Sequence, residues 1–298
     1  MMGTYALYRI AQWANTRLPP GFCVWLAERL ADLHCRRSVL DRSAVQSNLT
    51  LILGEAVVEG SPLVREVFRN FARYLVEFLG AHRRQPTVMF EGYERLANAV
   101  RLHRGSIVLS AHIGNWELGA VALRQLGFPV SVVVLPHQDS RVNQFFDHQR
   151  LRCGVGVISL GAKATQRCLQ RLREGQMLGI LGDREFGPNG IFVSLFGRQA
   201  FIPYGPAILS LRTGAPVIPA FFMRERPGQF RFYIEPPIWP PQGPKAKSTV
   251  VQLTQTYVRV IERYLRQFPS QWLMFQPFAS QPTTAKVNAN VWRYERVC

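Results

Sequence analysis

The residues best suited to chemistry lie in one stretch, Ser106–Val121, which reads SIVLSAHIGNWELGAV. It begins with an apolar run, Ile107–Leu109, that predicts a buried strand, and the apolar spacing from Trp116 onwards predicts the start of a helix. His112 and Glu117 lie at the junction of the two. A histidine and a carboxylate at such a turn can form a general-base pair, because the imidazole takes a proton from an attacking group while the carboxylate fixes its tautomer and stabilises the imidazolium.

The spacing of this pair sets a condition on the turn. His112 and Glu117 are five residues apart, whereas neighbours on one helix face are three or four residues apart. The pairing therefore requires part of the His-Ile-Gly-Asn segment to be non-helical, which Gly114 makes easy. In the alternative interpretation, His112 caps the helix and Glu117 only interacts favourably with the helix dipole.

A second group of charged residues, in the run GDREFG, follows another predicted buried strand at Met177–Leu181. Functional sites of α/β sheets lie at the carboxyl ends of the strands. Asp183 is therefore a candidate second carboxylate oriented toward His112, and Arg184 is a candidate phosphate ligand. The alternative is that Asp183 caps the loop and that Arg184 pairs with Glu185.

The elements that position these residues alternate between strands and helices, which predicts an α/β fold with a mixed, mostly parallel sheet. We expect a single domain over residues 1–298, with a helical part at residues 1–60 and a loose tail at residues 279–298. The further predicted elements are strands at Val130–Leu135, Val217–Met223 and, at an edge of the sheet, Phe230–Ile234, and helices at Tyr5–Arg17, Phe22–Arg37, Ala44–Leu53, after Ser61, and at Glu91–His103, Ala162–Glu174, Ala207–Thr213 and Val250–Phe268.

Composition narrows the class of protein. Of 298 residues, 47% are hydrophobic and 18% charged, which indicates a globular chain. The five cysteines are scattered without a CxxC pair, so we expect a reducing compartment, no disulfide framework and no metal site. We find no run of about 18 apolar residues that would span a membrane. The net charge of +17 attracts nucleic acid, anionic lipid or an acidic carrier protein, but no zinc-finger, RNP-like or helix-turn-helix pattern supports nucleic acid.

The motif HIGNWE, from His112 to Glu117, resembles the HxxNWE form of the HX4(D/E) motif of the lipid A biosynthesis acyltransferase family. That family contains the lauroyl and myristoyl transferases of Gram-negative bacteria, and the mycobacterial phosphatidylinositol mannoside acyltransferases resemble it. The resemblance continues in Leu195-Phe196-Gly197, in the PxGP…TGAPVIP pattern that ends at Pro219, and in the P-x-Q-W element at Pro269–Trp272, so it covers most of the chain.

The resemblance implies a glycerolipid-acyltransferase-like fold and assigns roles to the candidates. His112 would be the general base and Glu117 its orienting partner. Asn115 would bind the substrate or, alternatively, serve only in local positioning. The family shows an arginine in a helix placed like the one that carries Arg150, which implies a role at the reaction centre, where an arginine can hold a head group or an oxyanion. The alternative for Arg150 is a solvated basic helix face.

The reaction that this resemblance implies moves a fatty acyl group from a thioester to a hydroxyl of a lipid or glycolipid. Neither a cofactor nor a nucleophilic serine is required, since GxSxG is absent, and acyl carrier protein or coenzyme A would carry the acyl group as co-substrate. Some family members begin with a spanning helix. We expect instead a peripheral protein on the anionic, cytoplasmic face of a bacterial inner membrane, with Trp, Leu and Arg in its first two helices.

Two alternatives remain at this point. The same chemistry could use another acceptor, such as a lysophospholipid, a mannoside, an ornithine lipid or a polyene-type lipid. Alternatively, the chain could be a non-enzymatic protein that binds a membrane or an acyl carrier, although the intact pair of His112 and Glu117 argues against this.

Overall fold

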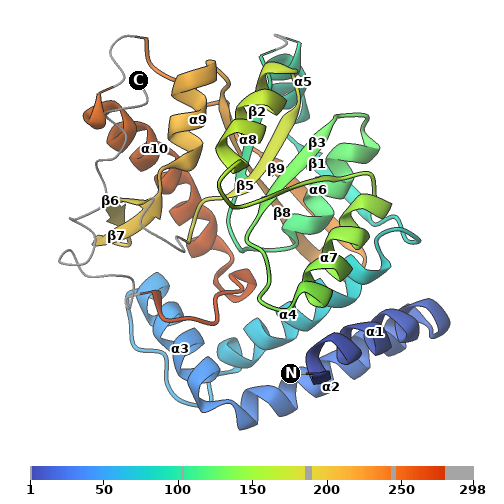
Figure 1. The fold of residues 1–298 in the computed structure, drawn as a ribbon. Coiled ribbons are helices and arrows are strands. Elements are labelled where there is room, and N and C mark those ends of the chain that lie inside the picture. The colour runs from blue at the N-terminus through green and yellow to red at the C-terminus, as the bar shows by residue number, and fades with distance from the viewer. Residues whose placement is uncertain (1, 102–103, 185–189, 243–245, 279–298) are drawn as a thin grey trace.

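The fold is built on a seven-stranded sheet, which a computed structural model shows in the order β1-β9-β8-β2-β5-β3-β4 (Figure 1). Neighbouring strands are parallel except for the antiparallel pair of β8 and β9, so the predicted α/β class with a mostly parallel sheet is confirmed. The structure describes residues 2–101, 104–184, 190–242 and 246–278. The strands of the sheet are β1 (Thr87–Glu91), β2 (Ser106–Ser110), β3 (Val130–Val134), β4 (Gly156–Ser159), β5 (Met177–Leu181), β8 (Val217–Arg226) and β9 (Gln229–Ile234), and a separate hairpin contains β6 (Gly190–Leu195) and β7 (Arg198–Pro203).

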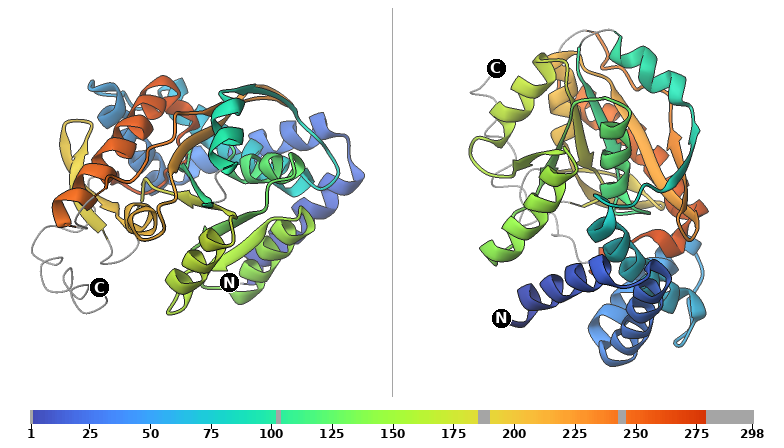
Figure 2. Two further views of the ribbon diagram at one scale, coloured as in Figure 1. Left: turned by 90° about the horizontal axis from the view of Figure 1, so that it is seen from above. Right: turned by 90° about the vertical axis from the view of Figure 1, so that its right-hand side faces the viewer.

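The central strand β2 carries the HIGNWE motif at its carboxyl end and is buried along its whole length. Alternate side chains of a strand point to opposite faces, so Ile107 and Leu109 pack with α8, α9 and α10, while Val108 packs with α5 and α6. Figure 2 shows these helices on both sides of the sheet. The helices that follow β1 are α5 (Tyr93–Val100), α6 (Trp116–Gln125), α7 (Ser140–Arg152), α8 (Ala164–Arg173), α9 (Gly205–Thr213) and α10 (Lys247–Gln267), followed by a short 3-10 turn at Pro269–Gln271.

Two predictions at one side of the sheet are wrong. Strand β9 is not an edge strand, because β8 and β1 pair with its two sides. Its alternating pattern reflects one face buried in the core and one partly exposed, which is compatible with an internal position. Glu91 does not begin a helix but ends β1, and the helix that follows is α5, Tyr93–Val100. Residues 102 and 103 of the predicted helix lie outside the described residues.

Four helices precede the sheet and lie together at one end of it (Figure 1). The predicted helix after Ser61 is confirmed, since the Ser61 side chain accepts a hydrogen bond from the backbone N–H of Leu63 and Pro62 occupies the first turn. None of the helices in the described ranges combines the length and the apolar character needed to cross a bilayer. The predicted tail at residues 279–298 lies outside the described residues. These four helices are α1 (Met2–Arg17), α2 (Pro20–Arg37), α3 (Val39–Leu53) and α4 (Pro62–Gly80).

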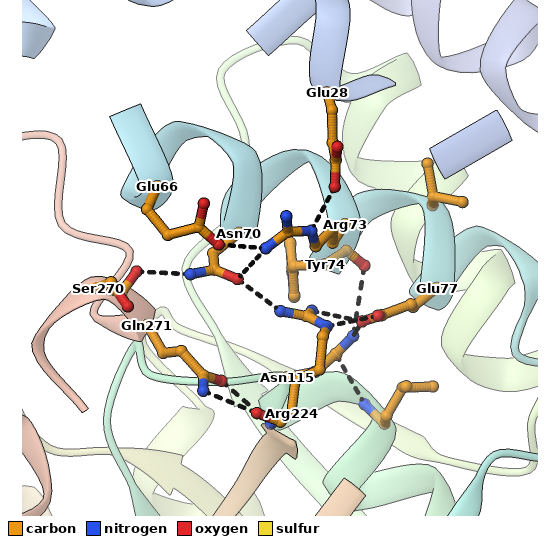
Figure 3. A network of polar contacts seen from close by, with 12 residues as sticks. Glu28, Glu66, Asn70, Arg73, Tyr74, Glu77, Asn115, Arg224, Ser270 and Gln271 are labelled. Carbon is orange, nitrogen blue, oxygen red and sulfur yellow. Dashed lines mark hydrogen bonds and ion pairs between the residues drawn. The ribbon is translucent and has the colours of Figure 1, made fainter. Parts of the chain in front are cut away.

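Helix α4 is joined to the sheet by a buried polar network (Figure 3). The guanidinium of Arg224, on β8, donates two hydrogen bonds of 2.6 Å to the Glu77 carboxylate and one of 2.8 Å to Asn70. Asn70 in turn donates to the backbone carbonyl of Ser270 at 2.9 Å. On the other side of α4, Arg73 bonds to Glu28 of α2 at 2.6 Å. This network therefore links the N-terminal helices and the sheet with residues 269–278 after α10, which we call the C-terminal segment.

We expect the Arg224→Leu variant to be about 3–5 kcal/mol less stable than the wild type, because it leaves the Glu77 carboxylate, whose side chain is only 15% exposed, without its cation. Urea denaturation followed by circular dichroism measures this difference. The matched control is Arg171→Leu, which breaks an ion pair with Glu174 whose two side chains are 46% and 39% exposed, and this should cost at most about 0.5 kcal/mol. Equal stabilities of the two variants would contradict the structural role of the network.

Candidate active site

Two neighbouring strand ends bring His112 and Asp183 together. His112 lies in the turn after β2, and Asp183 follows β5, whose Leu181 is paired with Ser110. The Nδ1 atom of His112 is 2.9 Å from Oδ1 of Asp183, and the backbone N–H of His112 donates to Oδ2 at 3.0 Å. Because the carboxylate holds Nδ1–H, the neutral imidazole presents Nε2 as its acceptor. This is the orientation that the sequence predicted for Asp183 as a second carboxylate.

The Asp183 carboxylate receives a further hydrogen bond from the C-terminal segment. Trp272 donates its indole N–H to Oδ2 at 2.9 Å, and Asp183 is fully buried. Burial by itself would raise the pKa of the Asp183 carboxyl group. The charge of the His112 ring in its protonated form and the hydrogen bonds from that ring, the Trp272 indole and the His112 backbone outweigh burial and hold the pKa of Asp183 below its ordinary value. The carboxylate is therefore ionised beside the imidazole.

The turn that carries His112 is held in place by its backbone. Gly114 has φ of +63°, and a Cβ atom there would lie 2.2 Å from the carbonyl oxygen of Phe222, so the position requires glycine. The backbone N–H of Gly114 donates to Gln271 at 3.0 Å, and the backbone N–H of Leu273 donates to the His112 carbonyl at 2.7 Å. The C-terminal segment thus pairs with both sides of Ile113. The expected non-helical step between the histidine and the helix is present.

Asn115 positions this turn. Its side-chain oxygen accepts from the backbone N–H of Leu118 and caps α6, while its side-chain nitrogen donates to Glu77 at 2.8 Å (Figure 3). The residue is fully buried, and both of its side-chain polar atoms bond to protein groups. This differs from the prediction of a substrate-binding residue. Asn115 ties the His112 turn to α4, which fits the alternative of local positioning.

Glu117 does not orient His112, contrary to the prediction. Its carboxylate accepts hydrogen bonds from Nε of Arg150 at 3.1 Å and from Nη2 at 2.6 Å, and both side chains are at least nine-tenths buried. Arg150 also bonds to Asp147 at 3.0 Å. Burial would lower the pKa of Arg150, but the charge and hydrogen bonds of Glu117 outweigh it and raise this pKa. The pairing differs because α7 brings the Arg150 guanidinium to Glu117. A buried carboxylate is costly unless a cation lies beside it.

A cavity of about 620 Å³ adjoins this site. Four candidate residues line it, namely His112, Glu117, Arg150 and Arg184, together with the aromatic ring of Trp116. Most of its remaining wall is apolar and comes from both layers of the core. Examples are Val108, Leu123, Val132, Ile180, Leu209 and Phe222. A cavity of this size and character can enclose a flexible hydrocarbon chain next to a polar reaction centre.

Arg184 follows Asp183 directly after β5 and is partly exposed. Its guanidinium contacts the side-chain oxygen of Gln276 and lines the cavity. Burial lowers the pKa of Arg184, and the charge of the neighbouring Asp183 offsets only part of this effect. Glu185, its partner in the alternative interpretation, lies outside the described residues. Within the described ranges, no cluster of three or more His, Cys, Asp or Glu side chains could hold a metal ion.

Sequence reasoning missed two residues of this site. Trp272 lies in the P-x-Q-W element, which the family resemblance marked but to which no chemistry was assigned. Tyr74 of α4 stacks on Trp116 with ring centroids 4.4 Å apart and lines the cavity. Burial, with a smaller effect of the Glu117 charge, raises the pKa of Tyr74 well above its ordinary value. Tyr74 lies among the buried apolar residues of α4, so no local signal in the sequence distinguishes it from an ordinary core residue.

Comparisons with known proteins found one matching family and several similar proteins. The family described as bacterial lipid A biosynthesis acyltransferase matches residues 1–278. A phosphatidylinositol mannoside acyltransferase of Mycobacterium tuberculosis is 25% identical over 275 residues, with 85% of each chain covered, and the protein of that name from Mycolicibacterium smegmatis is 25% identical over 245 residues, with 78% of each covered. Among solved structures, the 1-acyl-sn-glycerophosphate (LPA) acyltransferase PlsC of Thermotoga maritima has a TM-score of 0.40 and 17% identity, and the alignment covers 85% of this chain and 99% of that one.

We expect Trp272→Phe to lower the free energy of unfolding by about 1–3 kcal/mol, because Asp183 then lacks one hydrogen bond in a buried place. The bond stabilises the ionised carboxylate, whose pKa is depressed in the folded protein. The difference from wild type should therefore be fully present at neutral pH and shrink as the pH falls through the folded pKa of Asp183.

Denaturation curves measured from neutral to acidic pH test this expectation. Trp25→Phe, at a tryptophan that is 52% exposed on α2, is the control. A stability difference that is the same at every pH would show that Trp272 only fills space.

Proposed function

The chain belongs to the bacterial lipid A biosynthesis acyltransferase family, and we propose that it transfers a fatty acyl group from a thioester donor to a hydroxyl group of a lipid or glycolipid. The chain is an acyltransferase that acts on lipid acceptors, which sets aside the non-enzymatic alternative. The single observation that carries the proposed transfer from a thioester to a hydroxyl is the His112–Asp183 pair beside an apolar cavity.

His112 acts as the general base in this proposal. Its Nε2 atom takes the proton of the acceptor hydroxyl as the oxygen attacks the thioester carbonyl carbon. The ionised Asp183 carboxylate holds Nδ1–H and stabilises the imidazolium that forms. When the tetrahedral intermediate collapses, the carbon–sulfur bond breaks and the imidazolium gives its proton to the leaving thiolate. The products are the acylated lipid and the free thiol, and His112 returns to its neutral form.

Arg150 supplies positive charge next to the reaction. The hydrogen bonds to Glu117 and Asp147 use three of its five N–H groups, and the residue lines the cavity. We propose that its other N–H groups stabilise the oxyanion of the tetrahedral intermediate or hold a phosphate of a substrate. Glu117 then keeps the guanidinium in place, so the two residues act as a unit rather than through His112.

The donor and the location belong to the same proposal. An acyl group on acyl carrier protein or on coenzyme A would enter the cavity, and the acceptor would come from the membrane. We expect the enzyme to attach peripherally to the cytoplasmic face of an inner membrane. The first two helices support peripheral attachment. Their apolar side chains are exposed over both helices: Leu7, Ile10, Trp13, Phe22, Trp25 and Leu30. Exposed apolar stripes of this kind suit a membrane interface.

The named relatives suggest which acceptor lipids to test. The named mycobacterial relatives are phosphatidylinositol mannoside acyltransferases, so a mannoside is an acceptor to test beside a lipid A precursor, a lysophospholipid, an ornithine lipid and a polyene-type lipid. Mass spectrometry of lipids from cells with and without the gene would identify the lipid that lacks one acyl chain.

We expect His112→Ala and Asp183→Asn each to lower kcat by about 10²–10⁴-fold, because the first removes the base and the second removes the charge that orients it. Acyl transfer to a detergent-solubilised acceptor, measured by mass spectrometry, gives kcat. His34→Ala is a matched control, since His34 also lies 2.9 Å from an aspartate, Asp41, but on the exposed surface. Wild-type turnover of folded His112→Ala protein would disprove the proposed base.

We expect Arg150→Lys to lower kcat/KM by about 10²–10³-fold, because a point charge replaces the planar fork that both binds Glu117 and faces the cavity. A thermal melt of the same protein separates this loss from unfolding. The control is Arg167→Lys on the exposed face of α8, which should keep wild-type values. If folded Arg150→Lys protein retains full kcat/KM, Arg150 has only a structural role.

A further inference from the structure

A second hollow of the surface lies between α1 and α7 and has a volume of about 550 Å³. We call it the α1–α7 groove. Tyr5 and Tyr8 of α1 pack on Phe145 and Phe146 of α7, which holds the two helices together at this place. The groove is lined by Tyr5, Arg9 and Gln12 from α1 and by Arg141, Gln144, Phe145, His148 and Arg152 from α7.

The charged side chains that line the groove are all basic. Arg9 and Arg152 form no ion pair with any residue in the described ranges, and Arg141 pairs with Asp139 while it lies over the ring of Tyr5. Helix α1 contains no acidic residue. Two guanidinium groups without a carboxylate partner, together with the side-chain amide of Gln144, form a set of donors for a phosphate group, while the Gln12 amide donates to Gln149 at 3.5 Å.

Apolar side chains are exposed beside these basic residues. Leu7, Ile10 and Trp13 recur every three residues along α1 and are 66%, 61% and 60% exposed. Leu151, next to Arg152 at the end of α7, is 59% exposed. Apolar side chains that enter the acyl region of a bilayer, with basic groups at the level of the headgroups, are the arrangement of a helix that lies in a membrane interface.

We propose that the α1–α7 groove binds the phosphate of an anionic phospholipid headgroup while the stripe Leu7, Ile10 and Trp13 enters the membrane surface. This inference rests on the peripheral attachment proposed above and names the site that selects the lipid. An acidic carrier protein would satisfy the arginines but would leave three exposed apolar side chains in water, so the stripe favours lipid.

Helix α7 connects the groove to the reaction centre. Arg150 faces the catalytic cavity, whereas His148 and Arg152 line the groove on the same helix. A phospholipid bound in the groove would therefore hold the cavity close to the membrane surface, from which a lipid acceptor enters. The groove positions the enzyme and takes no part in the acyl transfer itself.

The experiment measures sedimentation of the full chain with vesicles of phosphatidylcholine alone and of an equimolar mixture with phosphatidylglycerol. We expect the wild type to prefer the mixed vesicles, and the double variant R9Q/R152Q to bind them about 10- to 30-fold more weakly. The control R167Q/R173Q removes the same charge from exposed positions of α8 and should weaken binding less than about threefold. Turnover of soluble substrates should be unchanged in R9Q/R152Q.

The outcomes separate this site from the rest of the proposal. If the two double variants lose the same binding, the charge acts diffusely and the headgroup site is disproved, while peripheral attachment stands. If the wild type binds neither kind of vesicle, attachment and headgroup site are both disproved, and the acyl transfer measured in detergent is unaffected. If R9Q/R152Q keeps vesicle binding but no longer binds purified acyl carrier protein, the groove serves a protein partner. Competition by monomeric dihexanoylphosphatidylglycerol, but not by inorganic phosphate at the same concentration, would identify the headgroup as the ligand.

Discussion

The buried carboxylate of Asp183 is the constraint on which the site depends. An ionised carboxylate without exposure to solvent is costly unless hydrogen bonds replace its lost hydration. Here the His112 ring, the His112 backbone and the Trp272 indole supply them. These donors come from the end of β2 and from the segment after α10, whereas the acceptor follows β5. One charge therefore joins three parts of the chain and sets the direction of the imidazole.

The rest of the polar core repeats this solution with arginines. Arg150 neutralises Glu117 between α7 and α6, and Arg224 neutralises Glu77 between β8 and α4. Asn115 bonds to Glu77 and also caps α6, so the two ion pairs are connected through the helix that starts at the motif. A buried pair is expensive to break because the remaining charge stays in a low-dielectric place. The turn with His112 is thus held from several sides, which supports the proposed role of His112 as the base, because such a group must be positioned accurately.

Two kinds of arginine contribute to the high positive charge of the chain. Those of the interior are paired with carboxylates and hold elements in place. Arg9 and Arg152 of the α1–α7 groove lie at the surface beside exposed apolar side chains. The two kinds fit the two parts of the proposal: the paired charges build a polar site next to an apolar cavity, and the surface charges would attract the anionic membrane that we propose as the binding surface.

Local patterns in the sequence were sufficient to predict many strands and helix starts of this protein. Strand β5 has the predicted bounds, β2 surrounds the predicted apolar run, and Ser61-Pro62 marks the start of α4, because buried strands and helix caps are encoded by neighbouring residues. The motif also identified His112 and, through its family resemblance, the class of reaction. The internal place of β9 was not readable, since a two-residue alternation reports which faces are buried and not which strands lie on either side.

The sequence offered two carboxylates as partners for His112, and the tertiary structure decided between them. Glu117 lies five residues away in the chain, but α7 supplies Arg150 to it, whereas Asp183, 71 residues away, reaches the imidazole because β2 and β5 are adjacent parallel strands that end at the same edge. Trp272 completes the site from a segment still farther along the chain. The sequence determined which groups are available and which strands carry them. Only the order of strands and helices in space determined which charge meets which, because electrostatic energy depends on distance and burial and not on separation along the chain.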